Sequence, residues 1–239
     1  MFVEFEYKPV LEDYNKDGTL KIGAILKVLE NSGNTHSDKA GDRILDGANN
    51  KKSWVLTDWK ISINKYPVYG DKITAKTWSQ TVTQILNVSR DFELYCNGEI
   101  CAIGTTRWII LDLDTGRPCK IEQDLISKYG PESKSVYTET KLEKIPVPED
   151  FSAVKEIQIR RSDIDFNDHV HNLTYLDYAM EVLPEDIYEK QNFSTLRITY
   201  KSVVKSGEKL VAKYKSVDGA NIVFIYNDKD ELKTQILLK

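Results

Sequence analysis

The feature that most constrains the fold of this chain is an internal repeat. Residues 61–76 read ISINKYPVYGDKITAK, residues 198–213 read ITYKSVVKSGEKLVAK, and the two align without a gap. Gly70-Asp71 then falls on Gly207-Glu208, both pairs typical of turns. A helical segment followed by several strands recurs in both halves. This order favours a duplicated unit over two hairpins that match by chance.

In the first half, alternating residues over 2–9 predict a strand. An apolar stripe predicts a helix over Leu20–Ser32, with Gly33 at the position of a C-terminal cap. The polar, glycine-containing stretch 34–52 is expected to be a loop that exposes His36 to solvent.

The segment just before this helix resembles the start of a calcium loop, with Asp13, Asp17 and Gly18 at suggestive positions. Such a loop needs a bidentate glutamate at its twelfth position, where this chain has Ala24. We therefore predict a turn that leads into the helix, and no calcium site.

Strand-like runs follow the helical segment in both halves. They cover 54–63, 72–78, 86–95 and 100–111 in the first half, and 195–204, 209–215, 222–226 and 232–238 in the second, where a further run, 154–160, comes before the helix. Asn97-Gly98 between two of them is a strong hairpin signal. This pattern predicts an α+β fold in which each half is one antiparallel sheet wrapped around one helix.

The polar, proline-containing stretch 122–150 predicts a connection between two units. We expect an N-terminal unit over 1–128, a linker over 129–144 and a C-terminal unit over 145–239. A single sheet of this kind has a free edge strand, which is an aggregation hazard. The two units are therefore expected to join edge to edge as a pseudo-dimer.

Composition argues against several classes of protein. The chain has 239 residues, 41% of them hydrophobic, and a net charge of −4, so a real core is expected and a nucleic-acid partner is not. The first residues, MFVEFEYKP, lack the apolar run of a secretory signal peptide. The sequence contains no run of ~18 apolar residues, so we expect no transmembrane helix. Cys96, Cys101 and Cys119 lack metal-ligand spacing and suggest reduced thiols in a cytoplasmic protein, without metal or other cofactor.

The chemistry of the chain is concentrated in residues 160–184, which read RRSDIDFNDHVHNLTYLDYAMEVLP. Asp165, Asn167 and His169 occupy alternate positions, so an extended backbone would point all three side chains the same way. A carboxylate, an amide and an imidazole are the groups needed to hold and deprotonate a water.

A purely structural interpretation of the same residues is that they form a polar helix start, because Asn and Asp often cap free backbone N–H groups. An apolar stripe predicts that a helix over Leu173–Leu183 follows and ends before Pro184. If that helix is buried, its N-terminal N–H groups could stabilise a developing oxyanion.

The stretch DIDFNDHVHNLTYLDYAMEVLP resembles the D-x-N-x-H-V-x-N segment of the acyl-[acyl-carrier-protein] thioesterases, plant and bacterial enzymes with two hotdog units in one chain. WVLTDWKISINKYPVYGD from Trp54 and RDFELYCNGEICAIGTTRWIILDLDTGRP from Arg90 match the family in order and spacing. The resemblance covers most of the chain. It implies a tandem hotdog fold, with the acyl chain between helix and sheet, and an enzyme that releases fatty acid from acyl carrier protein in fatty acid biosynthesis.

The resemblance also implies roles for individual residues. Asp165, Asn167 and His169 would be catalytic: Asp165 would orient its neighbours, Asn167 would position water or substrate, and His169 would act as the base or hold the thioester carbonyl. His171 and Asn172 would contribute to binding, although the family usually has Asn-Asn there.

The chain departs from the family pattern at the position about 34 residues after the motif histidine. Family members usually have a glutamate there, whereas this chain has Val203, which we expect in a strand as an ordinary core residue. The family's usual glycine after the motif asparagine is Asp168. Asp177 and Glu181 on the following helix are candidates to replace the missing acid.

Two further function classes therefore stay open: a protein that binds acyl thioesters without hydrolysing them, and an acyl-CoA thioesterase. The expected partner is acyl carrier protein, and a homodimer is also open. A group of lysines that recurs along two strand segments is either a docking surface for the acidic carrier or a solvated strand face. These lysines are Lys201, Lys205, Lys209, Lys213 and Lys215.

Overall fold

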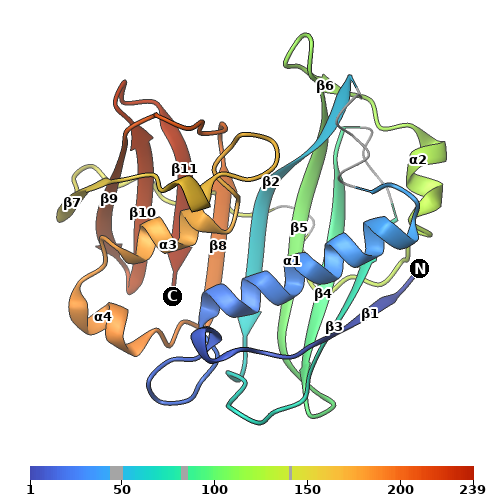
Figure 1. Ribbon diagram of the computed structural model, residues 1–239, viewed down its shortest axis with the longest axis horizontal. Coiled ribbons are helices and arrows are strands. Elements are labelled where there is room, and N and C mark those ends of the chain that lie inside the picture. Colours follow the sequence, from blue (N-terminus) through green and yellow to red (C-terminus); the bar gives the residue numbers. More distant parts are fainter. Residues whose placement is uncertain (44–50, 82–85, 140–141) are drawn as a thin grey trace. The chain divides into compact units, whose positions relative to one another are not determined.

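The computed structural model describes residues 1–43, 51–81, 86–139 and 142–239, and the chain forms two compact units, Met1–Thr140 and Lys141–Lys239 (Figure 1). The elements of the first unit are β1 (Val3–Tyr7), η1 (Leu11–Asp13), α1 (Ile22–Lys39), β2 (Lys52–Ile63), β3 (Ile73–Ser79), β4 (Val88–Cys96), β5 (Glu99–Asp112), β6 (Pro118–Cys119) and α2 (Gln123–Lys128). Those of the second are β7 (Ala153–Ile157), η3 (Arg161–Asp163), α3 (Thr174–Met180), α4 (Glu185–Lys190), β8 (Thr195–Tyr200), β9 (Leu210–Val217), β10 (Ala220–Asn227) and β11 (Leu232–Leu238).

Both units have the same strand order, which confirms the duplication predicted from the repeat. In the first unit the antiparallel order is β1-β3-β4-β5-β2, and β6 pairs with β5. In the second unit the antiparallel order is β7-β9-β10-β11-β8. If the strands of each unit are numbered one to five along the chain, both sheets therefore read 1-3-4-5-2.

In the first unit, α1 lies across the strands and buries its apolar stripe against the sheet (Figure 1). Ile25 and Leu29 on the helix are fully buried. On the sheet, the rings of Trp59 and Phe92 are 5.1 Å apart and both side chains are almost fully buried. An apolar stripe with a period of 3.6 residues on a helix and a period of two residues on strands predict this kind of core, in which a helix packs on a sheet.

The second unit repeats this arrangement with the shorter helix α3, whose Leu176 and Ala179 are buried. A second cluster in this unit joins Ile145, Ile222 and Phe224. Across the described parts of both units, we find no helix that combines the length and apolar character needed to span a bilayer.

The Asn97-Gly98 hairpin is confirmed between β4 and β5. Asn97 has φ 51° and Gly98 has φ 88°. Both residues lie in the left-handed region that a two-residue type I′ turn requires, which explains the choice of Asn and Gly.

The end of α1 differs from the prediction, because the helix runs to Lys39 instead of ending at Ser32. Gly33 lies inside the helix, where its lack of a side chain leaves space for Arg90. A Cβ there would lie 2.7 Å from Nη1 of Arg90, whose guanidinium donates to the Gly33 carbonyl and, at 3.3 Å, to Ser37 Oγ. The packing of the Arg90 guanidinium against the helix therefore favours glycine at this position, where sequence alone suggests a cap.

His36 was expected in a solvent-exposed loop, and this prediction is wrong. It lies on α1, is fully buried, and donates from Nε2 to the Tyr129 carbonyl at 3.1 Å. Its Nδ1 has no hydrogen-bond partner among the described residues. Part of the predicted loop, residues 44–50, lies outside the described residues.

Two other boundaries differ from the prediction. The helix expected over Leu173–Leu183 is shorter, because α3 ends at Met180, and a separate helix, α4, begins after Pro184. The strand expected over 195–204 ends at Tyr200. The cysteines Cys96, Cys101 and Cys119 are all free thiols, and the first two are buried.

We expect His36 to make the free energy of unfolding depend on pH. Burial and the nearby Arg90 guanidinium lower the pKa of His36 to about 4, whereas an unfolded histidine titrates near ~6.5. The unfolded chain therefore binds the proton first as the pH falls. This lowers stability between pH ~6.5 and ~4, by about 3 kcal/mol at most.

Urea unfolding of wild type and His36→Gln at several pH values measures this contribution. The glutamine keeps an N–H donor for the Tyr129 carbonyl but does not titrate. We expect its stability to fall less steeply in that range. If the free energy of unfolding changes with pH in the same way in wild type and His36→Gln, His36 does not contribute to the pH dependence.

Candidate active site

The D-x-N-x-H residues lie on a tight turn, and not on the extended segment that we predicted. The Asp165 N–H donates to the His169 carbonyl at 2.8 Å, and the Asp168 N–H donates to the Asp165 carbonyl at 3.1 Å. Asp168 has φ 60°, in the left-handed region that Asp tolerates better than most residues. The backbone of the motif residues therefore forms a turn that closes on itself.

The carboxylate of Asp165 organises this turn. Its Oδ1 accepts the backbone N–H of Asn167 at 2.8 Å and that of His169 at 3.3 Å. Asp165 and His169 are half-buried, whereas Asn167 is exposed. The acid thus fixes the backbone of the two residues whose side chains carry the amide and the imidazole.

A backbone bridge aligns His169 with the turn between β8 and β9. His169 pairs with Lys205 in an antiparallel bridge, and the Val170 N–H donates to the Val204 carbonyl at 2.8 Å. This pattern makes His169 and Lys205 a non-hydrogen-bonded pair, with Cα atoms about 4.5 Å apart and side chains on the same side. The register places the Lys205 side chain beside that of His169.

A buried aspartate, Asp163, holds the start of the loop. It is 3% exposed, and its carboxylate accepts Arg160 N at 2.8 Å, Arg160 Nε at 2.9 Å and the Tyr178 hydroxyl at 2.7 Å. Its carbonyl accepts the His171 N–H at 2.9 Å. Burial alone would raise the pKa of Asp163, but the bonds from Arg160 and Tyr178 outweigh it and keep the pKa below its usual value.

The first unit contains the same scaffold around Asp13. Its carboxylate accepts Val10 N at 2.9 Å, the Tyr7 hydroxyl at 2.7 Å and Lys27 Nζ at 3.2 Å. Its carbonyl accepts the Lys21 N–H at 2.8 Å. Asp13 and Asp163 therefore hold equivalent loops in the two units. The segment whose resemblance to a calcium loop we rejected is the first-unit copy of the motif loop.

The copied loop keeps the backbone geometry but not the side chains. Asn15 N–H donates to the Thr19 carbonyl at 2.8 Å, and Thr19 pairs with Val68 as His169 pairs with Lys205. Thr19 thus occupies the position of the motif histidine, and Asp17 that of the motif asparagine. A carboxylate, amide and imidazole in this order occur only on the second-unit loop, within the part of the chain that is described.

His171 and Asn172 follow directly and are half-buried. The Asn172 carbonyl accepts the Tyr200 hydroxyl at 2.9 Å, which ties the loop to the end of β8. The N-cap of α3 is Leu173, and no side-chain capping bond is present there. Asn172 is therefore not the helix cap of the structural interpretation. With seven residues, α3 also gives little support to an oxyanion site at its N-terminus.

Val203 is not the core strand residue that we expected. It lies beyond the end of β8 and is 50% exposed. Continuing the register of the His169–Lys205 bridge places Val203 opposite His171, on the face that carries His169. The position where the family has its glutamate is therefore beside the motif loop and accessible to solvent.

The acids proposed as substitutes have other surroundings. Glu181 forms an ion pair with Lys155 at 2.7 Å, and Asp177 is exposed on α3. Glu208 was not among the predicted acids, but it lies three residues after Lys205, the bridge partner of His169. Burial raises the pKa of Tyr175, and the negative charges of Glu208 and Asp165 raise it further.

Glu208 also shapes the turn that carries Lys205. Its Oε1 accepts the Lys205 N–H at 2.8 Å, and its carboxylate lies 3.5 Å from Lys233 Nζ. In the first unit, Asp71 Oδ2 accepts the Val68 N–H at 2.9 Å in the same way. The Gly-Glu and Gly-Asp pairs that defined the repeat thus hold the turns against which the two loops bridge.

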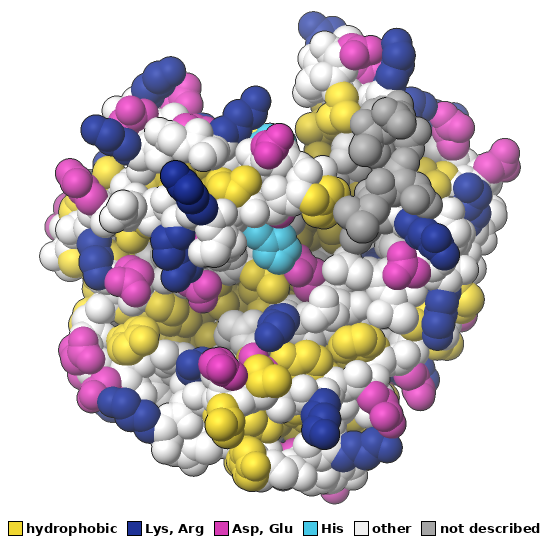
Figure 2. Space-filling model, viewed as in Figure 1, with side chains coloured by type: hydrophobic (Ala, Val, Ile, Leu, Met, Phe, Trp, Pro, Cys, Tyr) yellow, Lys and Arg dark blue, Asp and Glu magenta, His cyan; other side chains and the backbone are white. Residues whose placement is uncertain are grey.

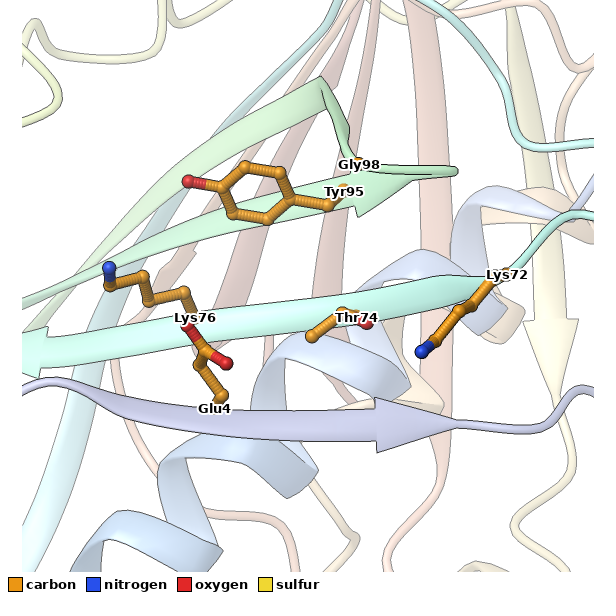
Figure 3. Close-up of a pocket in the computed structure, with 6 residues that line it drawn as sticks. All are labelled: Glu4, Lys72, Thr74, Lys76, Tyr95 and Gly98. Atoms are coloured by element: carbon orange, nitrogen blue, oxygen red, sulfur yellow. The ribbon is translucent and has the colours of Figure 1, made fainter.

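One hollow of the structure lies away from the motif loop. Figure 3 shows a hollow of about 240 Å³ on the first unit, on the face of the β1–β3–β4 sheet opposite α1. It is lined by Glu4, Lys72, Thr74, Lys76, Tyr95 and Gly98. None of the motif residues lines it. Within the described ranges, no group of three or more His, Cys, Asp and Glu side chains could hold a metal ion.

Histidine is visible in cyan in the space-filling view of Figure 2, where cationic and acidic side chains otherwise alternate over the surface. Since His36 is fully buried, imidazole at the surface comes from the motif loop. A side chain that is half-buried and reaches the surface can meet both a bound substrate and water.

Two family models match the chain. The acyl-ACP thioesterase N-terminal domain matches residues 3–129, and the acyl-ACP thioesterase C-terminal domain matches residues 148–238. The chain belongs to the acyl-ACP thioesterase family. The motif loop falls in the C-terminal domain and its copy in the N-terminal domain.

Relatives and solved structures agree with the family. Oleoyl-acyl carrier protein thioesterase 1, chloroplastic, of Arabidopsis thaliana is 28% identical over 218 residues, which are 83% of this chain and 60% of that protein. The acyl-[acyl-carrier-protein] hydrolase FATB1, chloroplastic, of Cuphea viscosissima is 30% identical over 70% of this chain and 41% of its own length. The chain thus spans about two fifths to three fifths of these curated relatives.

Among solved structures, the 12:0-ACP thioesterase of Umbellularia californica has a TM-score of 0.90 at 17% identity, covering 100% of this chain and 96% of that one. An acyl-ACP thioesterase of Bacteroides thetaiotaomicron has a TM-score of 0.86 at 20% identity, covering 99% and 96%. At these identities the likeness establishes the fold, and it confirms the predicted tandem hotdog.

The paired aspartates allow a matched test of the scaffold. We expect Asp163→Ala to lower the free energy of local opening of residues 160–171 by about 1–3 kcal/mol, because three donors lose a buried acceptor. Asp13→Ala should have the same effect on residues 10–21. Native-state hydrogen exchange measures both. Equal protection in wild type and variants would contradict the scaffold role.

Proposed function

We propose that this chain hydrolyses the thioester of fatty acyl-[acyl-carrier-protein] and releases free fatty acid for fatty acid biosynthesis. The observation that carries the proposal is the ordered turn that groups Asp165, Asn167 and His169 in a chain matched by both domains of the family. The substrates named for the relatives are fatty acyl groups on acyl carrier protein.

The chemistry assigned to these side chains is attack of water on the thioester carbonyl carbon. His169 is the base: its imidazole takes a proton from water as the oxygen bonds to carbon. The C–S bond then breaks, and the leaving thiolate receives a proton. Asn167, exposed at the tip of the turn, offers an amide that can position the water or the carbonyl.

Asp165 acts mainly through the backbone in this proposal. Its carboxylate accepts the N–H groups of Asn167 and His169, so it orients both functional side chains. His171 and Asn172, next along the chain, are assigned to binding. The backbone carbonyl of Asn172 accepts the Tyr200 hydroxyl of β8, which supports a role for Asn172 in lining the binding site and not in the reaction itself.

Val203 favours a second candidate, a protein that holds acyl thioesters with little or no hydrolysis. A valine at the family's glutamate position supplies neither an acceptor nor a negative charge beside His169. An acyl-CoA substrate is the third candidate, since CoA presents the same thioester on the same pantetheine arm. The cytoplasmic location and the homodimer expected from sequence remain predictions.

Release of free thiol from a panel of thioesters tests the proposed function. The panel contains acyl carrier protein loaded with acyl chains of different lengths, and the matching CoA esters. We expect carrier-protein esters to be hydrolysed with the higher kcat/KM. Binding of acyl carrier protein without any thiol release would support the second candidate, and preference for CoA would support the third.

The role of the motif histidine has a matched control in the other unit. We expect His169→Ala to lower hydrolysis by about 10²-fold or more, the usual scale for a lost acid–base group. Thr19→Ala, at the equivalent position of the first-unit loop, should leave the rate near wild type. Because both residues lie on polar loops, both variants should fold normally. Hydrolysis by His169→Ala at the wild-type rate would remove His169 from the mechanism.

Substitution at Val203 tests the departure from the family. We expect Val203→Glu to raise kcat by up to about 10²-fold, because the new carboxylate faces the side of the loop that carries His169. Val203→Gln, whose side chain has the shape of glutamate without the charge, should raise kcat only a little. Since Val203 is 50% exposed, both variants should keep the wild-type free energy of unfolding within about 0.5 kcal/mol.

These two variants separate charge from shape. If the glutamate and glutamine variants have the same kcat, no acid is needed at this position. An equal kcat for wild type and Val203→Glu would point to an acid already present, with Glu208, which holds the turn that carries Lys205, as the candidate.

A further inference from the structure

We propose that three lysines around the turn between β8 and β9 form the docking surface for the acidic carrier protein. We call Lys201, Lys205 and Lys209 the basic rim. The proposal rests on the proposed function, because it names the part of the chain that receives the carrier of the acyl group. The fold and the motif do not show where the carrier protein binds, and the proposal assigns that contact to these three lysines.

The charge of this region differs from that of the chain as a whole. The chain has a net charge of −4, yet the segment from residue 190 to residue 215 contains seven cations and one acid, Glu208. The cations are Lys190, Arg197, Lys201, Lys205, Lys209, Lys213 and Lys215. A strongly basic segment in an acidic protein needs either internal partners or an external one.

Internal partners account for several of these cations. Arg197 is buried and donates to the Glu143 carbonyl at 3.1 Å. Lys213 pairs with Asp230 at 3.0 Å, and Lys215 pairs with Asp150 at 2.9 Å. Of the five lysines that sequence alone suggested for docking, these last two are therefore already neutralised.

The three lysines of the basic rim are exposed and form no ion pair with the residues that the structure describes. Glu208, the acid among them, is engaged by the Lys205 N–H and by Lys233. On the neighbouring loop, the carboxylate of Asp165 is engaged by backbone N–H groups, and Asp168 is the exposed acid. The rim thus keeps charge that is available to a partner.

The rim is adjacent to the proposed reaction site. Lys205 is the bridge partner of His169, with its side chain on the same side. Lys201 follows the last residue of β8, and Lys209 precedes the first residue of β9. A partner bound across these three lysines would therefore lie over the loop that carries the catalytic side chains.

The first-unit copy shows that the scaffold does not require these cations. In the aligned repeat, Asn64 and Val68 stand where the second unit has Lys201 and Lys205. Lys72, the counterpart of Lys209, is paired with Glu6 at 2.9 Å. The same turn and bridge form without a basic rim, so the rim belongs to the function of the second loop.

The width of the rim favours a protein surface over a single phosphate. β8 and β9 are separated in the sheet by β11 and β10, so Lys201 and Lys209 are about 14 Å apart at three strand spacings. One phosphate group is much smaller than this span. An acidic surface with several carboxylates can meet all three lysines while the pantetheine arm reaches the loop.

Charge reversal tests the proposal, with a matched control in the same unit. Lys201→Glu/Lys209→Glu changes the rim and keeps Lys205 beside His169. Lys190→Glu/Lys239→Glu makes the same change in net charge. Lys239 pairs with Thr195 at the start of β8, and Lys190 ends α4 just before it, so the control lies at the opposite end of that strand from the rim.

The measurement is kcat/KM on an acyl carrier protein ester, the same acyl-CoA and the same acyl-N-acetylcysteamine, at about 0.05 M and 0.5 M salt. We expect the rim variant to lower the ratio of carrier to N-acetylcysteamine activity by about 10-fold at low salt and by much less at high salt. The control variant should keep the wild-type ratio.

Two other outcomes overturn the proposal. Equal loss of carrier and CoA activity in the rim variant would mean that the lysines recognise the phosphate and not the protein. Equal ratios in rim variant, control and wild type would place carrier docking elsewhere. A wild-type protein that hydrolyses none of the three esters would refute the proposed function itself. In that case, binding of the acyl carrier protein to wild type and rim variant still tests the rim.

Discussion

The structure depends on a buried carboxylate at the start of a loop, which accepts hydrogen bonds from the residue before the loop and from side chains outside it. Asp163 and Asp13 each take a backbone N–H from the residue three positions earlier, a tyrosine hydroxyl and a cation. A buried carboxylate without donors is costly, so the loop must keep its conformation for the unit to fold. In the second unit, the conformation secured in this way is the one that aligns His169 with Lys205.

Duplication separates what the fold needs from what the chemistry needs. Both units share the strand order, the buried aspartate, the bridge and the acidic turn residue, Asp71 or Glu208. The carboxylate, amide and imidazole series and the exposed lysines occur on the second loop. Shared features are therefore those that the fold requires, and the features of one copy alone are those to which we assign the proposed function. This distinction usually needs many related sequences, and here one chain provides it.

Much of the fold could be predicted from the sequence, because the strands, the Asn97-Gly98 hairpin and the repeat depend on local pattern. The end of α1 could not be, since residues after Ser32 are polar and their partners, Arg90 and Tyr129, are distant in sequence. The motif residues were proposed as a site from their chemistry, and their roles stay predictions. The scaffold role of Asp163 could not be predicted, because its contact with Tyr178 is tertiary. When residues 13–20 are aligned with residues 163–170, Asp13 and Asp163 are the one identical pair.

One residue of the motif turn bears on how freely this loop moves. Asp168 has φ 60°, whereas the equivalent residue of the first-unit loop is glycine, Gly18, with φ 82°. Glycine reaches this region easily but has many other conformations in the unfolded chain, and a residue with a side chain has fewer. The second loop therefore loses less backbone entropy on ordering. Asp168 also allows the backbone immediately before His169 fewer alternative conformations than Gly18 allows before Thr19.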